Sequence, residues 1–370
     1  MTALVATDTT GPAQKTGTVN GRKETGILPP LLDVRNLHTE FRTGAGIVRA
    51  VDGVSYTVDR GEIAAIVGES GSGKTVGALS ILRLIPDPPG RITQGEIFFA
   101  GRDLLRLSND AIRQVRGGDI GMIFQEPMTS LNPVLTIGRQ ITETLEQHRG
   151  LDHAAAQKRA VELLGLVGIA EPARRLRQYP HQLSGGMRQR IMIAIALACD
   201  PKLIIADEPT TALDVTIQAQ ILELMKELTR RLNVALIIIT HNLGVVARYA
   251  NRVNVMYAGR LVESGPAAAI YHEPRHPYTM ALLRSVPRLD RPRQARLDPV
   301  EGQPPDLTRL DIGCAFRPRC RFAVADCALS QPPLEPAGDA QHLAACFRSH
   351  EIALETAAPL LPAVSAIAAS

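Results

Sequence analysis

The sequence contains no tryptophan, and aromatic residues make up only 4% of its 370 residues. Proteins that bind single-stranded nucleic acid stack bases on aromatic side chains, so this composition disfavours such a surface. The formal net charge is only +4, from 41 basic and 37 acidic residues, which gives no support for binding a polyanion through charge alone. We therefore expect no nucleic-acid partner.

Long apolar runs are also missing. No stretch approaches the roughly 20 apolar residues that a membrane-spanning helix needs, and the most apolar stretches, such as 234–239, have the length of buried strands. The start of the chain lacks the charged and then apolar pattern of a signal peptide. We expect a soluble, cytoplasmic chain that reaches a membrane only through a partner.

A glycine-rich segment follows an apolar run at 62–67, which has the pattern of a buried parallel strand. The segment matches the phosphate-binding motif G-x-x-x-x-G-K-[ST] without a mismatch, and apolar spacing over 76–84 predicts a helix after it. Strand, glycine loop and helix are the context that a P-loop requires. The candidate nucleotide-binding residues of this motif are Gly68, Glu69, Ser70, Gly71, Ser72, Gly73, Lys74 and Thr75.

Each residue type in this motif suits a phosphate. Glycines let successive backbone N–H groups turn toward phosphate oxygens without a clash from a Cβ atom. The following helix adds the positive end of its dipole. Lys74 supplies a charge for the β- and γ-phosphates, and Thr75 offers a hydroxyl to Mg²⁺. The segment therefore predicts a nucleotide site with a bound magnesium ion.

A pair of acidic residues ends a second buried-strand pattern at 203–206. Successive strand residues point to opposite faces, so Asp207 and Glu208 can divide two tasks between them. Asp207 would hold Mg²⁺, and Glu208 would polarise the attacking water. The alternative is a helix N-cap, because Pro209 and Thr210 follow.

The segment 183–190 reads LSGGMRQR and resembles the LSGGQ signature of ABC ATPases, with Met187 where glutamine is more usual. A serine hydroxyl and two glycines before a predicted helix at 187–199 make a second helix start suited to an anion. A plain N-cap with a glycine loop is the alternative. The signature residues, which would bind the ATP held by a partner cassette, are Ser184, Gly185, Gly186 and Met187.

The resemblance to ABC ATPases assigns further roles. Gln125 matches the Q-loop, residues 212–214 the D-loop and His241 the switch histidine, while Phe41 matches the aromatic residue that stacks on adenine. The catalytic residues that it implies are Glu208, His241 and Gln125. The Mg²⁺ ligands that it implies are Thr75, Gln125 and Asp207.

The resemblance covers about residues 32–350, and the chain carries one P-loop and one signature. In this family two cassettes pack head to tail, and each ATP lies between the P-loop of one and the signature of the other. The family implies a second ABC ATPase subunit, expected to be a paralogue that forms a heterodimer. It also implies two transmembrane permeases, an extracytoplasmic solute-binding protein and a peripheral location on the cytoplasmic face of the inner membrane.

Two segments resemble one branch of this family. Residues 125–135 read QEPMTSLNPVL, and HPYT stands at 276–279, as in ATPases of oligopeptide, dipeptide and nickel importers. The resemblance implies ATP hydrolysis coupled to uptake of di- or oligopeptides, with nickel or another small solute as the alternative. A binding-only subunit is a further alternative. A soluble ABC ATPase acting on nucleic acid or ribosomes is disfavoured, because residues 75–183 are too few for a long coiled coil and show no heptads.

Four of the five cysteines lie near the end of the chain, and Cys199 stands apart in an apolar helix pattern, where we expect a buried side chain. A reducing cytosol disfavours disulfides among the four, and zinc sites usually show C-x₂₋₄-C pairs, which are missing. Thiolates also hold [4Fe–4S] clusters, whose ligand spacing varies. Zinc and reduced thiols stay open as alternatives. The four candidate ligands are Cys314, Cys320, Cys327 and Cys346.

Some members of the resembled branch carry an iron–sulfur cluster at this place, and the resemblance favours a [4Fe–4S] cluster here. Three nearby arginines, Arg317, Arg319 and Arg321, would offset the negative charge of such a cluster or form a solvated face.

We expect a mixed α/β fold: a P-loop ABC cassette with a core α/β sheet, an antiparallel β subdomain, an α-helical subdomain and a small cysteine-containing C-terminal domain. The two ends of the chain show little regular apolar pattern, so we expect them to be disordered or flexible. The predicted boundaries are a disordered arm at 1–30, the nucleotide-binding domain at 31–274 with its helical subdomain at about 134–182, the extension at 275–350 and a flexible tail at 351–370.

Overall fold

The computed structural model describes residues 29–126, 130–211, 213–285 and 300–355. Most of the predicted N-terminal arm therefore lies outside the described residues, as does the predicted tail from residue 356 onward. Residues 351–355 belong to helix α13 (Ser349–Glu355), which crosses the predicted boundary at 351. No helix in the described ranges is both long and apolar enough to span a membrane.

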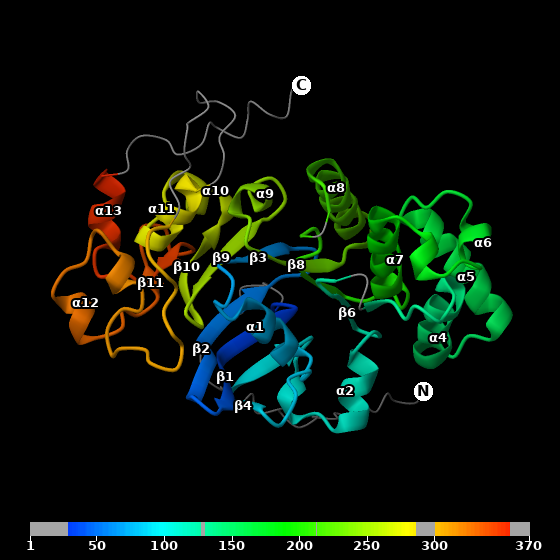
Figure 1. Ribbon diagram of the computed structural model, residues 1–370, viewed down its shortest axis with the longest axis horizontal. Helices are drawn as coiled ribbons and strands as arrows, with labels where there is room; N and C mark the ends of the chain where they lie inside the picture. Colours follow the sequence, from blue (N-terminus) through cyan, green and yellow to red (C-terminus); the bar gives the residue numbers. More distant parts are fainter. Residues whose placement is uncertain (1–28, 127–129, 212, 286–299, 356–370) are drawn as a thin grey trace, which may run out of the picture.

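The central sheet contains eight strands in the order β11-β12-β10-β9-β3-β8-β7-β6 (Figure 1). Its parallel strands are β6 (Ile120–Ile123), β7 (Leu203–Asp207), β8 (Ala235–Thr240), β3 (Ile63–Val67) and β9 (Arg252–Tyr257). β10 (Arg260–Pro266) lies antiparallel to β9. β3, β7 and β8 are buried along their whole length, as is usual for parallel strands covered on both faces. The sequence predicted these three strands to within one residue at either end.

Alternate residues of the parallel strands face two different cores. Ile204 and Ala206 pack with helices α7 (Gly185–Leu197) and α8 (Val215–Leu232) on one face. Ile205, on the other face, packs with α1 (Lys74–Ile81), and Figure 1 shows α1 and α8 on opposite sides of the sheet. Both α1 and α7 begin two residues earlier than predicted. For α7 the reason is the cap, because the Ser184 side chain accepts a hydrogen bond from the Met187 N–H.

A second, antiparallel sheet has the order β2-β1-β4-β5. Its strands are β1 (Leu32–Thr43), β2 (Gly46–Val58), β4 (Gly90–Phe99) and β5 (Arg102–Asp103). The buried side chains of this sheet join the core around α1. The chain then forms η1 (Leu104–Arg106) and α2 (Asn109–Val115) before it enters the central sheet at β6. This is the antiparallel β subdomain that the sequence predicted.

A group of helices lies between β6 and β7. It consists of α4 (Ile137–Arg149), α5 (His153–Leu166), α6 (Pro172–Arg175) and η2 (Pro180–Gln182), followed by α7. α4 begins at the Thr136 cap and ends at Gly150, which adopts a left-handed conformation. Its apolar side chains pack against α5 and α7, so these helices share the core on the α8 side of the sheet.

The segment after β10 contains α10 (Ala267–His272), α11 (Pro277–Arg284), η3 (Arg317–Arg319), α12 (Asp326–Leu329), β11 (Glu335–Pro336) and β12 (Leu343–Ala344). β12 pairs with β10 and so extends the central sheet. Phe316 packs with Tyr257 and Tyr278, in a core that also contains side chains of α9 (Leu243–Val246), β3 and β9. The described part of this segment therefore packs on the cassette, and the small cysteine-containing C-terminal domain that the sequence predicted is not confirmed.

A buried carboxylate joins the segment to β10. Glu263, on β10, is fully buried and accepts hydrogen bonds from the Arg275 and His276 N–H groups, at 2.7 and 3.0 Å. The His342 Nε2 atom lies 2.7 Å from the same carboxylate. A buried carboxylate needs such partners, and two of the three come from backbone that follows the cassette.

Candidate nucleotide-binding and hydrolysis site

The P-loop connects the buried end of β3 to the start of α1, as predicted. Gly73 caps α1 with a φ of +100°, a region that side chains with a Cβ atom avoid. A Cβ atom at this position would lie 2.0 Å from the Ala50 carbonyl oxygen, so the close approach of β2 also requires glycine. The loop is therefore shaped by the surrounding fold as well as by its own residues.

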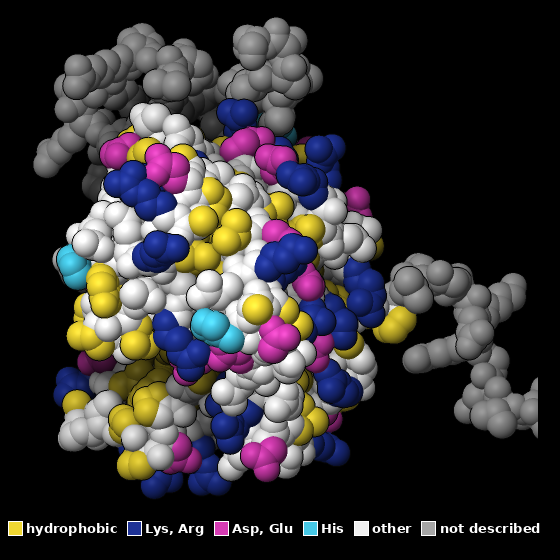
Figure 2. Space-filling view, turned by 90° about the vertical axis from the view of Figure 1, so that its right-hand side faces the viewer, with side chains coloured by type: hydrophobic (Ala, Val, Ile, Leu, Met, Phe, Trp, Pro, Cys, Tyr) yellow, Lys and Arg dark blue, Asp and Glu magenta, His cyan; other side chains and the backbone are white. Residues whose placement is uncertain are grey.

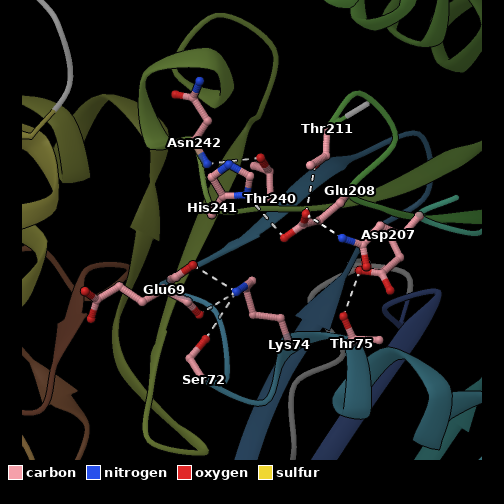
Figure 3. Close-up of polar contacts among 12 residues, drawn as sticks. Glu69, Ser72, Lys74, Thr75, Asp207, Glu208, Thr211, Thr240, His241 and Asn242 are labelled. Carbon is pink, nitrogen blue, oxygen red and sulfur yellow. Dashed lines mark hydrogen bonds and ion pairs between the residues drawn. The ribbon is translucent and has the colours of Figure 1, made fainter. Parts of the chain in front are cut away.

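The Lys74 side chain is buried inside the loop. Its Nζ atom donates hydrogen bonds to the carbonyl oxygens of Gly68 and Glu69, both at 2.8 Å, and lies 3.4 Å from Ser72 Oγ (Figure 3). Burial lowers the pKa of Lys74, while the nearby carboxylates raise it. The loop thus holds an ammonium group on neutral acceptors, which an incoming anion can replace.

Thr75 and Asp207 form the second part of the site. The Thr75 hydroxyl donates a hydrogen bond to Asp207 Oδ1 at 3.0 Å, across 132 residues of sequence. Burial raises the pKa of Asp207, and Glu208 raises it further, whereas Thr75 and Lys74 lower it. A carboxylate beside a hydroxyl supplies the hard oxygen ligands that Mg²⁺ prefers.

Glu208 is the point at which three separate segments meet. Its Oε2 atom accepts hydrogen bonds from Gln125 Nε2 at 3.0 Å and from the Thr211 hydroxyl at 2.8 Å. His241 Nδ1 lies 3.2 Å from Glu208 Oε1 (Figure 3). Glu208 itself has a φ of +45°, an uncommon conformation for this residue type, and its side chain is 14% exposed. The structure brings together the three predicted catalytic residues Glu208, His241 and Gln125.

The signature lies at the start of α7. Ser184 and Gly185 are exposed, and the Ser184 side chain caps the helix through the Met187 N–H at 3.4 Å. No hydrogen bond in the described part of the chain joins these residues to the P-loop. The structure therefore does not bring the signature into the site around Lys74 and Glu208.

Two other predicted residues lie outside this group. Phe41 is half-buried on β1, and its ring lies against Gly90, where a Cβ atom would come within 2.6 Å of it. No described contact joins Phe41 to the P-loop, so its contact with adenine stays a prediction. In the D-loop, Ala212 lies outside the described residues, and Asp214 caps α8 by accepting a hydrogen bond from the Ile217 N–H at 3.0 Å.

The structure adds two residues to the P-loop that the sequence analysis did not place there. Tyr278 Oη accepts a hydrogen bond from the Glu69 N–H at 2.8 Å. Arg319 forms an ion pair with the Glu69 side chain at 2.7 Å. The Arg319 side chain is only 4% exposed, so the alternative that it faces solvent is wrong, whereas its effect on the charge of a cluster stays a prediction. The HPYT motif is the one sequence signal that pointed to Tyr278, and none pointed to Arg319.

The four C-terminal cysteines line one cavity, which is also lined by His276 and Phe316. Cys199 lies elsewhere and is buried, as predicted. Burial raises the pKa of Cys314 and Cys320, and raises that of Cys346 to about 12. All five cysteines are free thiols. Within the described ranges, no group of three or more His, Cys, Asp or Glu residues is placed to hold a metal ion, so the predicted cluster stays a prediction.

Known families and structures agree with this site. Residues 51–211 match the family model for ABC transporters, and residues 262–327 match that for the oligopeptide/dipeptide transporter C-terminal region. The ATP-binding cassette MJ0796, in a dimeric post-hydrolysis structure bound to ADP and Pi, is 30% identical. The structural match covers 64% of this chain and 98% of the MJ0796 chain, with a TM-score of 0.57. Fold and site together define a P-loop ATPase of the ABC cassette type.

Two curated proteins of Bacillus subtilis (strain 168) are similar over most of the chain. The oligopeptide transport ATP-binding protein OppD is 53% identical over 85% of this chain and 87% of its own length. The dipeptide transport ATP-binding protein DppD is 55% identical over 80% of this chain and 89% of its own length. The chain belongs to the ABC transporter family, in the group that carries the oligopeptide/dipeptide transporter C-terminal region. It is an ATPase subunit of a transporter, which confirms the resemblance seen in the sequence.

Proposed function

We propose that this chain hydrolyses ATP to drive the import of di- or oligopeptides through a membrane complex. The observation that carries the proposal is the meeting of Gln125, Glu208 and His241 beside Lys74 and the Thr75–Asp207 pair. A binding-only subunit would not need an acidic residue held in this way. The names of OppD and DppD favour peptides over nickel as the solute.

Each residue has a defined task in the reaction. Lys74 exchanges its two carbonyl acceptors for the β- and γ-phosphates, whose charge stabilises the ammonium group. Thr75 and Asp207 would hold Mg²⁺, which would supply positive charge to offset the charge of the phosphates. Glu208 exchanges one of its donors for a water molecule and accepts its proton as the water oxygen attacks the γ-phosphorus. The bond from that phosphorus to the bridging oxygen breaks, and its electrons leave with ADP.

The assembly completes the site. Because Ser184 and Gly185 are exposed and no hydrogen bond among the described residues joins the signature to the P-loop of the same chain, we infer that a second cassette supplies the signature for this ATP. We infer a partner ATPase, two permeases and an extracytoplasmic binding protein, with this chain peripheral on the cytoplasmic face of the inner membrane. The functional units would be a nucleotide-binding domain at 31–274, with a helical subdomain at 134–182, and an extension at 275–350.

The charge distribution gives no support for a nucleic-acid substrate. Figure 2 looks onto the face formed by α4, α5 and α6, where Lys and Arg side chains alternate with Asp and Glu. A protein that binds the phosphate backbone by charge needs a continuous basic surface. This face therefore gives no support for binding DNA or RNA through charge.

The substitution Glu208→Gln tests the function. It removes the proton acceptor and preserves the shape of the side chain, so we expect ATP hydrolysis by the assembled transporter to fall about 100-fold or more. ATP binding to the isolated chain should remain. The measurement is phosphate release by the transporter in membrane vesicles, together with peptide uptake.

Glu223→Gln is the matched control, because Glu223 is exposed on α8 and lies 4.0 Å from Arg248. It should leave hydrolysis unchanged. Undiminished turnover in the Glu208→Gln transporter would mean that another subunit performs the hydrolysis.

We also propose that Cys314, Cys320, Cys327 and Cys346 hold a [4Fe–4S] cluster. What supports this is that the four thiols line one cavity although their sequence spacing is irregular. A zinc ion needs its four ligands at one tetrahedral centre, whereas a cluster is held by thiols around a larger group. The cluster would brace a segment with few apolar side chains.

Iron and acid-labile sulfide content of the anaerobically purified chain tests this proposal. We expect about four irons and four sulfides per chain, because four thiolates hold one such cluster. Cys320→Ser should lose them, whereas Cys199→Ser is the matched control, because Cys199 lies apart from the cavity. One zinc per chain, or no metal, would refute the cluster and leave the ATPase proposal standing.

A further inference from the structure

Arg319, a residue of the C-terminal extension, binds the side chain of Glu69 in the P-loop. Arg319 Nη1 donates a hydrogen bond to Glu69 Oε2 at 2.7 Å, and Arg319 Nη2 donates to Glu69 Oε1 at 3.0 Å. Two parallel bonds between a guanidinium and a carboxylate give both strength and a fixed geometry. The two residues are 250 positions apart, and the Arg319 side chain is only 4% exposed.

Arg319 is itself fixed in place. Its Nε atom donates to the Glu301 carbonyl oxygen at 2.8 Å, and Nη2 also donates to the Val300 carbonyl oxygen at 3.1 Å. Nη1 makes a further hydrogen bond to Tyr257 Oη at 3.3 Å. All three nitrogen atoms of the guanidinium are thus engaged. Because the arginine cannot adjust freely, it sets the position of Glu69 rather than following it.

Glu69 connects Arg319 to the phosphate site through two backbone hydrogen bonds. Its N–H donates to Tyr278 Oη at 2.8 Å, and its carbonyl oxygen accepts a hydrogen bond from Lys74 Nζ at 2.8 Å. Tyr278 is fully buried and packs on Tyr257, with ring centres 4.6 Å apart. The extension therefore contacts both the side chain and the backbone of the P-loop residue on which the Lys74 ammonium rests.

Neutralising Glu69 also has an electrostatic effect. Glu69 is one of the x positions of the P-loop, so an unpaired carboxylate there would repel the phosphates of ATP. A guanidinium held on that carboxylate cancels this repulsion in a partly buried place, where screening by solvent is weak. The other two arginines of this turn do not take part: Arg317 pairs with Asp311, and Arg321 lies over Phe322.

We propose that Arg319 is a positioning residue of the nucleotide site. Together with Tyr278 it anchors Glu69, so the C-terminal extension sets the affinity of the P-loop for ATP. This inference rests on the proposed function, in which the P-loop binds ATP. It also makes the cysteine cavity a neighbour of the ATP site, since Cys320 follows Arg319 directly and lines that cavity.

The test is binding of a fluorescent ATP analogue, with Mg²⁺, to the full-length chain. Arg319→Gln should weaken binding about tenfold, the effect expected for losing a charged, bidentate hydrogen bond. Arg317→Gln is the matched control, because it removes an arginine from the same turn that pairs with Asp311 instead. It should leave the affinity unchanged. Wild-type affinity in the Arg319→Gln chain would overturn the proposal.

A double substitution separates positioning from mere support of the extension. If the deficit of Arg319→Gln comes from the unpaired carboxylate, Glu69→Gln in the same chain should restore much of the binding. A deficit that is the same with and without Glu69→Gln would mean that Arg319 only holds residues 300–301, and the proposal would be wrong.

Tyr278→Phe provides a second route, needed if thermal melting shows that Arg319→Gln is unfolded. It retains the packed ring and removes only the acceptor of the Glu69 N–H, so we expect binding to weaken about threefold. Unchanged binding in this variant would then count against the proposal. A wild-type chain that binds no analogue would refute the proposed function as well, and this outcome is distinct from all the others.

Discussion

The chain contains two glycine-rich helix starts of similar chemistry, the P-loop before α1 and the signature before α7, and they differ in their surroundings. In the P-loop, Ser72 and Lys74 are buried and hydrogen-bonded within the chain. In the signature, Ser184 and Gly185 are exposed. Both offer backbone N–H groups and the positive end of a helix to an anion, yet one site is built into the fold and the other faces outward.

The glycines show what this difference means. A Cβ atom at Gly73 would lie 2.0 Å from Ala50 O, so the fold of this chain alone requires glycine there. A Cβ atom at Gly185 would lie no closer than 3.4 Å to any neighbour, an ordinary contact with Leu213. Nothing in the described part of the chain requires glycine at 185. The exposed backbone at Gly185 stays open to a molecule that approaches from outside, which agrees with ATP held by a second cassette.

The largest effect that follows from this comparison is expected for Gly73→Ala. The added methyl group meets a backbone oxygen, and the φ of +100° is unfavourable for alanine, so the P-loop has to change its shape. We expect the isolated chain to bind the fluorescent ATP analogue about 100-fold more weakly, which corresponds to about 3 kcal/mol. Binding within a few-fold of the wild type would show that the loop tolerates the change and that the two glycines do not differ.

A smaller effect is expected for Gly185→Asp, and it should appear in ATP hydrolysis by the transporter rather than in ATP binding by the isolated chain. The isolated chain should bind ATP as the wild type does, because the signature is exposed and no hydrogen bond in the described ranges joins it to its own P-loop. In the assembled transporter the new carboxylate would face the phosphates held by the partner, so hydrolysis should fall about tenfold through charge repulsion. The measurements are analogue binding to the isolated chain and phosphate release by the transporter.

Ala155→Asp adds the same charge at an exposed position of α5 and serves as the control for Gly185→Asp. It should leave both quantities unchanged. A loss of ATP binding in the isolated Gly185→Asp chain would contradict the comparison, because it would mean that the signature acts on the ATP of its own chain.

The parts of the site that depend on local sequence were predicted well. The P-loop, the Asp207–Glu208 pair and the strands before them follow from short patterns in which each residue type has a chemical reason. Gln125 and His241 came from the resemblance, and the structure brings both to Glu208. The predicted helix boundaries were less accurate. A capping residue such as Ser184 decides where a helix begins, and this residue is not part of the apolar pattern that predicts the helix.

The C-terminal extension was predicted least well. We expected a small cysteine-containing C-terminal domain, but β12 pairs with β10 and Phe316 packs into the cassette core. An exposed strand edge gains hydrogen bonds from a neighbouring strand wherever that strand lies in the sequence. A segment with few apolar side chains also has more surface to bury on an existing core than around one of its own.

The sequence by itself determined the chemical groups of this protein: a phosphate loop, two adjacent acidic residues at a strand end, a signature and four cysteines. Only the tertiary structure decided which of these groups meet. It placed Arg319 on Glu69 across 250 residues, gathered the four cysteines around one cavity and left the signature facing outward. The physical reason is that a motif is a property of neighbouring residues, whereas an ion pair between distant segments forms only after the intervening sheet and cores have brought them together.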